Sequence, residues 1–283
     1  MLQKVRSTFS ADFSFFMAVP GVIWQVFFCL VPLLLIAAFS IYDVTTFQVT
    51  MRYFIALFDY VHLKMIFLSS MLALGTTLNC LVIGYPIAFY IARKVEHYKN
   101  LFLFFLIIPF WTNLLILVYS WIFILEKNGI LNSFLKSIGL VSEPFNILNS
   151  LIAVALVTFY CYLPFMVLPL YTALEKIDDT LLEASADLGA NRIQTFFKVI
   201  VPLSWSGIRT GCFLVYVPVF GEYVVPLLMG GDKYMFVGSG ISHYVFTALN
   251  ISQGAAFTLL AGFALLSTVV LLNIVLKKII FTL

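Results

Sequence analysis

The sequence predicts an all-α integral membrane protein, with six transmembrane helices forming one domain over residues 1–283. Three observations predict this class: 63% of the residues are hydrophobic, only 10% are charged, and the mean hydropathy is +1.07. Soluble domains are about half apolar and about a quarter charged, so this chain has too few polar groups to cover its apolar surface in water. The composition therefore excludes a soluble globular enzyme, a nucleic-acid-binding protein and a disordered chain.

Six stretches are long and apolar enough to cross a bilayer, which takes about 20 residues in a helix. They are residues 15–41, 66–92, 101–125, 147–174, 205–229 and 255–276. Helices are expected because in lipid each backbone amide must be satisfied within its own segment, and the alternating pattern of barrel strands is absent. The first stretch is too long for a signal peptide and lacks a clear cleavage site, so we interpret it as a retained anchor.

The basic residues predict the orientation of these spans. One side of the predicted membrane carries ten Lys and Arg residues: Lys4, Arg6, Arg93, Lys94, Lys99, Lys176, Arg192, Lys198, Lys277 and Lys278. The other side carries five, in longer loops: Arg52, Lys64, Lys127, Lys136 and Lys233. Because Lys and Arg are enriched in cytoplasmic loops, both termini are expected in the cytoplasm.

Signatures of catalysis and of nucleotide or metal binding are missing from the sequence. There is no G-x-x-x-x-G-K-[ST] loop, so this chain is not expected to bind nucleotide by a P-loop. The predicted spans contain no Asp and no His, and Glu222 is their one evident acid, so no catalytic residues are expected. The four cysteines lie singly in separate spans and the three histidines lack ligand spacing, so no metal site is expected either.

We call residues 175–204, which connect the fourth and fifth spans, the elbow. Asp178 and Asp179 are suited to the start of a short helix near Thr180, because acids there cap the free amides and complement the helix dipole. Gly189 suits the left-handed position that ends such a helix. Asn191 is a candidate cap for a second helix. The elbow is therefore predicted to be two short helices joined by a tight corner.

One narrow face of the first elbow helix is predicted to be apolar or small, because Leu181, Ser185 and Leu188 are spaced four and three residues apart. Ala184 and Ser185 would let a partner protein approach closely. The alternative is an amphipathic helix lying on lipid headgroups. The acids of the elbow match anionic lipid poorly; they are Asp178, Asp179, Glu183 and Asp187.

The elbow resembles the EAA motif of ABC-importer permeases, which is E-A-A, three residues, Gly, nine residues and I-x-L-P. This chain has Glu183-Ala184-Ser185, then Gly189, then Val199-Ile200-Val201-Pro202. It departs from the motif at Ser185, Val199 and Val201, while the Glu, Gly and Pro registers are intact. In that family the segment is a coupling helix seated in a groove of a separate ATPase. The resemblance implies this role for Glu183, Ala184, Ser185 and Gly189, together with the adjacent Asp187.

Nearly the whole chain resembles the permeases of polyamine (spermidine/putrescine) importers. The segments that carry this resemblance are Gly84-Tyr85-Pro86, Pro109-Phe110-Trp111-Thr112-Asn113, Leu163-Pro164-Phe165-Met166, and Phe220 to Pro226 followed by Gly230-Gly231.

The resemblance implies the type I ABC importer permease fold, in a bacterial inner membrane. It implies a second permease, two copies of a cytoplasmic ATPase and a periplasmic or extracellular binding protein as partners, besides membrane lipid. ATP and Mg²⁺ would then belong to the ATPase, with no cofactor in this chain. The alternatives are a related ABC importer for another small solute and an ion-coupled secondary transporter, although intramembrane acids for ion coupling and an internal repeat are not evident.

Glu222 is a candidate solute contact, because an ionisable residue inside a span is costly unless it is paired or lines water. It lies between Pro218 and Pro226, so an interruption of the fifth span is expected there. A polyamine would bind a carboxylate and aromatic faces. The aromatic candidates Tyr216, Phe220 and Tyr223 follow helical spacing around Glu222. Alternatively, Glu222 lies at the membrane interface or pairs with the sister permease, and the aromatics form an interfacial belt.

The third span adds a second polar stripe to the candidate path. Thr112 and Tyr119 are predicted to share one face, and Asn113 and Ser120 the next. Trp111, Asn113 and Tyr119 are the candidates from this span. In the fifth span, the pair Gly207 and Gly211 predicts a close approach of two helices.

Overall fold

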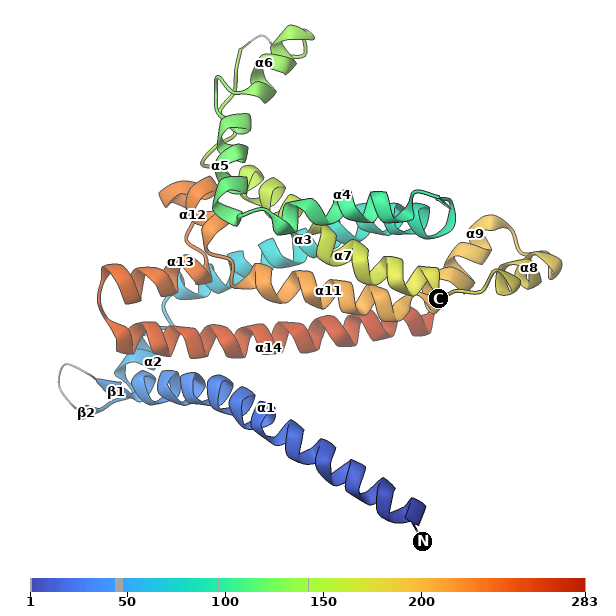
Figure 1. Cartoon of the computed structure of the whole chain (residues 1–283). Coiled ribbons are helices and arrows are strands. Elements are labelled where there is room, and N and C mark those ends of the chain that lie inside the picture. Colours follow the sequence, from blue (N-terminus) through green and yellow to red (C-terminus); the bar gives the residue numbers. More distant parts are fainter. Residues whose placement is uncertain (1, 44–47, 96, 142, 283) are drawn as a thin grey trace. The chain divides into compact units, whose positions relative to one another are not determined.

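The computed structural model describes residues 2–43, 48–95, 97–141 and 143–282. The chain divides into two compact units. The first consists of Met1–Asp59 and Tyr244–Leu260, and the second of Tyr60–His243 and Ala261–Leu283. Figure 1 gives the order of the elements along the chain.

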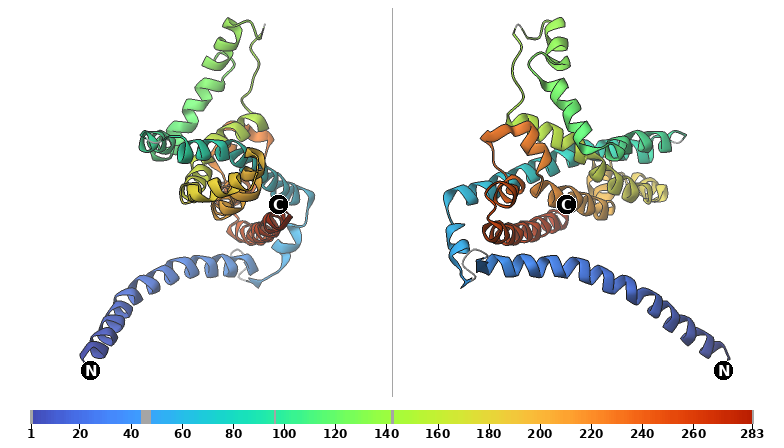
Figure 2. Two further views of the ribbon diagram at one scale, coloured as in Figure 1. Left: turned by 90° about the vertical axis from the view of Figure 1, so that its right-hand side faces the viewer. Right: turned by 60° about the vertical axis from the view of Figure 1, so that its left-hand side comes forward.

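The first unit begins with the long helix α1 (Leu2–Ile41), which contains Pro20 and Pro32 and is curved along its length (Figure 2). Prolines inside a helix remove backbone hydrogen bonds and favour such bending. An antiparallel pair follows, β1 (Tyr42–Asp43) and β2 (Gln48–Val49), with Tyr42 opposite Val49. The unit continues through α2 (Arg52–Ala56), the π-helical η3 (His243–Thr247) at its border and the start of α14 (Ile251–Thr282). The hydroxyl of Ser252 donates to the Tyr42 carbonyl at 2.8 Å.

The second unit is built around three helices that pack side by side (Figures 1 and 2): α3 (Tyr60–Arg93), α7 (Leu151–Glu175) and α11 (Trp205–Phe220). Its remaining elements before the elbow are α4 (Lys99–Trp111), α5 (Leu114–Leu125) and α6 (Ile130–Ser137). Those of the elbow are α8 (Asp179–Asp187), α9 (Arg192–Thr195), η1 (Phe196–Ile200) and α10 (Val201–Leu203). After α11 come α12 (Val224–Gly230), η2 (Gly231–Lys233) and α13 (Val237–Ser242).

Helices α7 and α11 are in close contact because α11 carries glycines where they meet. A Cβ atom on Gly207 would lie 2.6 Å from the Ala173 Cβ and from the Pro169 carbonyl oxygen. A Cβ on Gly211 would lie 2.6 Å from the Met166 sulfur. The close approach predicted from the pair Gly207 and Gly211 is therefore confirmed, with α7 as the partner helix.

Two predicted spans are not continuous helices. The fifth is interrupted between α11 and α12, as expected at Glu222. The third, predicted as one helix over 101–125, is instead α4 and α5. The break lies at Thr112, whose backbone is extended with φ −76° and ψ 142°. Asn113 then starts α5, because its side-chain oxygen accepts from the amides of Leu115 at 2.9 Å and Ile116 at 3.4 Å.

The helices have the length and apolar character needed to span a membrane. Within the part of the chain that the structure describes, five helical stretches meet this requirement. They are Ala18–Ile41, Tyr60–Arg93, Leu114–Ser137, Leu151–Glu175 and Ile251–Lys278. Arg192–Leu203 and Trp205–Phe220 meet it together as a pair bent by 65°, which makes up to six.

Helix α6 belongs to an excursion between α5 and α7 that one buried side chain closes. The Asn132 amide, 3% exposed, donates to the carbonyls of Glu126 at 3.1 Å and Phe145 at 2.9 Å. Its oxygen accepts from the Phe145 amide at 3.3 Å. These bonds fasten both ends of the excursion to one residue.

Candidate functional site

The elbow begins with a capped helix, as the sequence predicts. The Asp178 carboxylate accepts a hydrogen bond from the backbone amide of Thr180 at 3.0 Å, which satisfies one of the free amides of the first turn of α8. This bond lowers the pKa of the Asp178 carboxyl below its usual range, and Arg93 contributes to the same shift. Asp178 is therefore held as an anion at the positive end of α8.

The corner after α8 depends on Gly189, which has the left-handed backbone that was predicted, with φ +79°. The Gly189 amide donates to the Ala186 carbonyl at 2.8 Å, and the Ala190 amide to the Ser185 carbonyl at 3.1 Å. This pair of bonds is the Schellman arrangement, which satisfies the last carbonyls of a helix. The turn therefore needs a residue that tolerates positive φ.

The second elbow helix begins at Asn191, also as predicted. The Gln194 amide donates to the Asn191 side chain at 2.8 Å, and the Gln194 side chain accepts from the Asn191 amide at 2.9 Å. The α8 and α9 helices are joined by a hydrogen bond of 2.9 Å between the hydroxyls of Ser185 and Thr195.

The predicted face of Leu181, Ser185 and Leu188 does not form. Ser185 is turned inward toward Thr195 and is only 8% exposed, whereas Leu188 is 89% exposed. Leu188 follows the last residue of α8 as its C-cap, so helical spacing no longer applies to it. Ser185 consequently fixes the shape of the elbow from within and offers no surface to a partner.

The exposed surface of the elbow combines acids with an apolar tip. Glu183, Ala184 and Asp187 are exposed, as a docking role requires. Leu188 and Ile193 are 89% and 70% exposed and lie on either side of the corner. Large apolar side chains exposed at the end of a protruding segment are typical of protein–protein contacts. Reasoning from the sequence did not identify Ile193 as an exposed residue of the elbow, although its position two residues after the predicted cap Asn191 indicated that it lies next to the corner.

Glu222 lies in the break between α11 and α12, half-buried, with both carboxylate oxygens engaged. Oε1 accepts from the backbone amides of Tyr223 at 3.1 Å, Val224 at 3.0 Å and Val225 at 3.5 Å, so it caps α12. Oε2 accepts from the Tyr162 hydroxyl at 2.6 Å. The carboxylate is thus stabilised by the first amides of α12 and by one exchangeable hydroxyl.

The aromatic candidates near Glu222 do not line one face. Because α11 ends at Phe220, Tyr223 lies beyond the break and helical spacing does not carry to it. Tyr216 and Phe220 are 0% and 3% exposed, so both are packed inside the second unit. Tyr223 is partly exposed beside the carboxylate. Within this chain, Tyr223 is the one of the three that an incoming solute could reach.

The candidates of the third span are also separated by a break. Asn113 is a helix cap whose oxygen is occupied by two amides of α5. Thr112 lies in the break and its hydroxyl donates to the Ile108 carbonyl at 3.0 Å, so it does not share a helical face with Tyr119. Trp111 and Tyr119 are 76% and 51% exposed, on α4 and α5 respectively.

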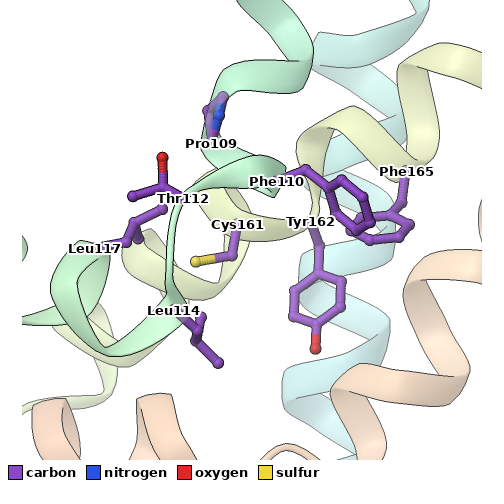
Figure 3. A pocket seen from close by; sticks show the side chains of 8 residues that line it. All are labelled: Pro109, Phe110, Thr112, Leu114, Leu117, Cys161, Tyr162 and Phe165. Carbon is purple, nitrogen blue, oxygen red and sulfur yellow. The ribbon is translucent and has the colours of Figure 1, made fainter.

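A cavity of about 220 Å³ opens at this break, between α4, α5 and α7 (Figure 3). The residues that line it are Pro109, Phe110, Thr112, Leu114, Leu117, Cys161, Tyr162 and Phe165. The rings of Phe110 and Phe165 meet edge-on with centroids 5.2 Å apart, and the Tyr162 hydroxyl points away from them (Figure 3). Tyr162 therefore connects the cavity to Glu222. No periodic pattern predicts the contact between Tyr162 and Glu222, because it joins α7 to the end of α11.

Among the described residues, no group of three or more His, Cys, Asp or Glu side chains is placed to hold a metal ion.

Comparisons with known proteins match most of this chain. The model of the family described as binding-protein-dependent transport system inner membrane component matches residues 84–280. The spermidine/putrescine transport system permease protein PotB of Haemophilus influenzae is 41% identical over 241 residues, covering 83% of this chain and 84% of that protein. PotB of Escherichia coli is 39% identical over 252 residues, covering 86% of this chain and 92% of its own length.

The fold is also found in a solved structure. The crystal structure of a bacterial ABC transporter that imports the acidic polysaccharide alginate contains a chain that matches with a TM-score of 0.76. The match covers 98% of this chain and 99% of that one, at 16% identity. The fold predicted from the sequence, that of an ABC importer permease, is confirmed.

Proposed function

The chain belongs to the family of binding-protein-dependent transport system inner membrane components, and from this premise we propose that it is the permease subunit of an ATP-driven polyamine importer. The observation that carries the substrate class is the similarity to two spermidine/putrescine permeases, which runs through most of the chain. As a member of this family it is a multi-pass inner membrane protein and a transport subunit. We place both termini in the cytoplasm, on the side richer in Lys and Arg.

The elbow is the proposed docking site for a cytoplasmic ATPase. The exposed Glu183, Ala184 and Asp187 and the apolar tip of Leu188 and Ile193 would enter the groove of the partner, while Gly189 fixes the corner. ATP and Mg²⁺ would bind to the two ATPase subunits. When the two ATPase subunits close on nucleotide, they would draw this elbow toward the elbow of a second permease. This closure would drive transport only if nucleotide favours one of two packings of the permeases.

Glu222 is the proposed contact for a cationic solute. An ammonium group is a strong donor to a carboxylate, and it would replace the Tyr162 hydroxyl at Oε2 while the α12 amides keep Oε1 in place. Tyr223, exposed beside it, would offer its ring face to the same cation, worth about 0.5–2 kcal/mol. Trp111 and Tyr119 are exposed on neighbouring helices and would extend the path. One carboxylate does not neutralise a polyamine, so further acids would come from the partner permease or the binding protein.

The test is reconstitution of the full importer in proteoliposomes, with the second permease, the ATPase and the external binding protein. We expect labelled spermidine or putrescine to accumulate only with ATP, the ATPase and the binding protein all present. Uptake by this chain without the ATPase would support the ion-coupled alternative. ATP-driven uptake of a different small solute, with polyamines excluded, would identify a related importer instead.

A further inference from the structure

The elbow is attached to α3 at three points. Tyr85 and Ser204 share a hydrogen bond of 2.8 Å between their hydroxyls. The Phe196 ring meets the rings of Tyr85 and Phe89 edge-on, with centroids 5.5 Å and 6.1 Å apart. The first attachment is thus a hydrogen bond between hydroxyls and the second a pair of aromatic contacts. The third is an ion pair of Arg93 with Asp179.

Arg93 holds the beginning of the elbow. Its Nη1 donates to Asp179 Oδ1 at 2.9 Å, and its side chain is only 11% exposed, against 79% for Asp179. The Nε and Nη2 atoms are buried and have no hydrogen-bond partner within the described residues. Asp179 is therefore the hydrogen-bonded ionic partner of a largely buried guanidinium, and the charge of Asp178 also acts on Arg93.

Tyr85, Phe89 and Arg93 are four residues apart, so they lie on one face of α3. We call this set the α3 stripe. Along the elbow, the stripe contacts Asp179 at the start of α8, Phe196 in η1 and Ser204 before α11. A segment held near its beginning, middle and end on one face of a helix cannot swing on that helix without breaking several contacts at once.

We propose that the elbow and the cytoplasmic end of α3 move as one body, and that Tyr85, Phe89 and Arg93 are positioning residues that transmit the displacement of the elbow to α3. This rests on the proposed function, because the elbow is displaced only if an ATPase holds it. Since α3 also packs against α7 and α11 in the core of the second unit, its movement would change the packing of these three helices.

The first experiment compares stripe residues with their immediate neighbours in the reconstituted importer. Phe89→Ala and Arg93→Ala remove stripe contacts. Tyr90→Ala and Lys94→Ala are matched controls, because Tyr90 and Lys94 are exposed and lie off the stripe. We expect the stripe variants to lower the polyamine taken up per ATP hydrolysed by roughly fivefold or more, with the controls unchanged. An unchanged ratio in both stripe variants, or an equal loss in the controls, would overturn the proposal.

A second experiment restores the attachment covalently. Arg93→Cys and Asp179→Cys are combined in a chain whose four native cysteines are replaced, and the complex is treated with a short bifunctional thiol reagent. We expect uptake per ATP to be low before cross-linking and to recover afterwards, because the proposal needs the two sites to stay together throughout the cycle. Cross-linking that blocks uptake, or leaves it low, contradicts the proposal.

The two proposals fail differently. If the wild-type complex shows no ATP-driven polyamine uptake, the proposed function is wrong. If the wild type transports while the stripe variants keep a normal ratio, the transmission by α3 alone is wrong.

Discussion

Replacing Gly189 by Leu is expected to loosen the end of α8 and to uncouple ATP hydrolysis from transport. Gly189 has φ +79°, and no atom lies within 4 Å of the position its Cβ would take. The cost is therefore backbone strain and not a steric clash, and it amounts to about 1–2 kcal/mol for an L-residue in the left-handed region. A change of this size shifts a local opening equilibrium by a factor of about 5–30.

The assay pairs amide hydrogen exchange of α8 and α9, and of α6 for the control, with uptake per ATP hydrolysed in the assembled importer. Gly139→Leu is the matched control: Gly139 has φ +74°, equally open space and the same two backbone bonds at the end of α6. We expect faster local exchange in both variants but a lower transport ratio only for Gly189→Leu. Normal coupling in Gly189→Leu despite faster exchange, or uncoupling in Gly139→Leu, would refute the role of the elbow corner.

Three other predictions test separate parts of the structure. Glu222→Gln should slow the initial uptake of spermidine while the complex still assembles, and Tyr162→Phe, which keeps the carboxylate, should slow it less; unchanged kinetics in Glu222→Gln would leave Glu222 as a helix cap. Gly207→Ala should destabilise the detergent-purified chain by about 1–3 kcal/mol through overpacking. The control is Gly75→Ala, whose added Cβ meets no atom within 4 Å and should not lower the thermal midpoint of unfolding. Equal midpoints for the two variants would contradict the close contact of α7 and α11. The pKa of the Asp178 carboxyl is lowered from the ordinary 3.8, so its stabilisation of α8 is complete above that pH and is lost as the pH falls through the lowered value. Amide exchange in α8 should therefore rise at that low pH, and Asp178→Asn should abolish the rise. A rise that persists in Asp178→Asn would assign the pH response to another group.

The details of the elbow that could be predicted are those decided by one residue and its nearest amides. Asp178 and Asn191 cap helices because a short polar side chain reaches the amides two or three residues on, and Gly189 ends α8 because it tolerates positive φ. The direction of Ser185 was not predictable in the same way. It depends on Thr195, which approaches only after the chain has turned back.

The spans could be located from composition, but the breaks within them could not all be. The break at Glu222 was predictable because Pro218 and Pro226 lie on either side of it. The break at Thr112 was not predictable, since the apolar run continues on both sides of it and Pro109 is accommodated within α4. The bond between Tyr162 and Glu222 joins α7 to the end of α11, so it follows from tertiary packing that no local pattern records.

The hydrogen bonds of the Asn132 side chain to Glu126 and Phe145 join the two ends of the segment that contains α6. Leu131, next to Asn132 in α6, also packs against the buried core of the second unit, so this segment is attached to the helical bundle as well as to itself. Ile130 and Phe134 of α6 are 69% and 58% exposed, so they can be replaced without removing Leu131 or the Asn132 hydrogen bonds. Exchanging Ile130 and Phe134 for the residues of a relative should therefore leave the permease assembled.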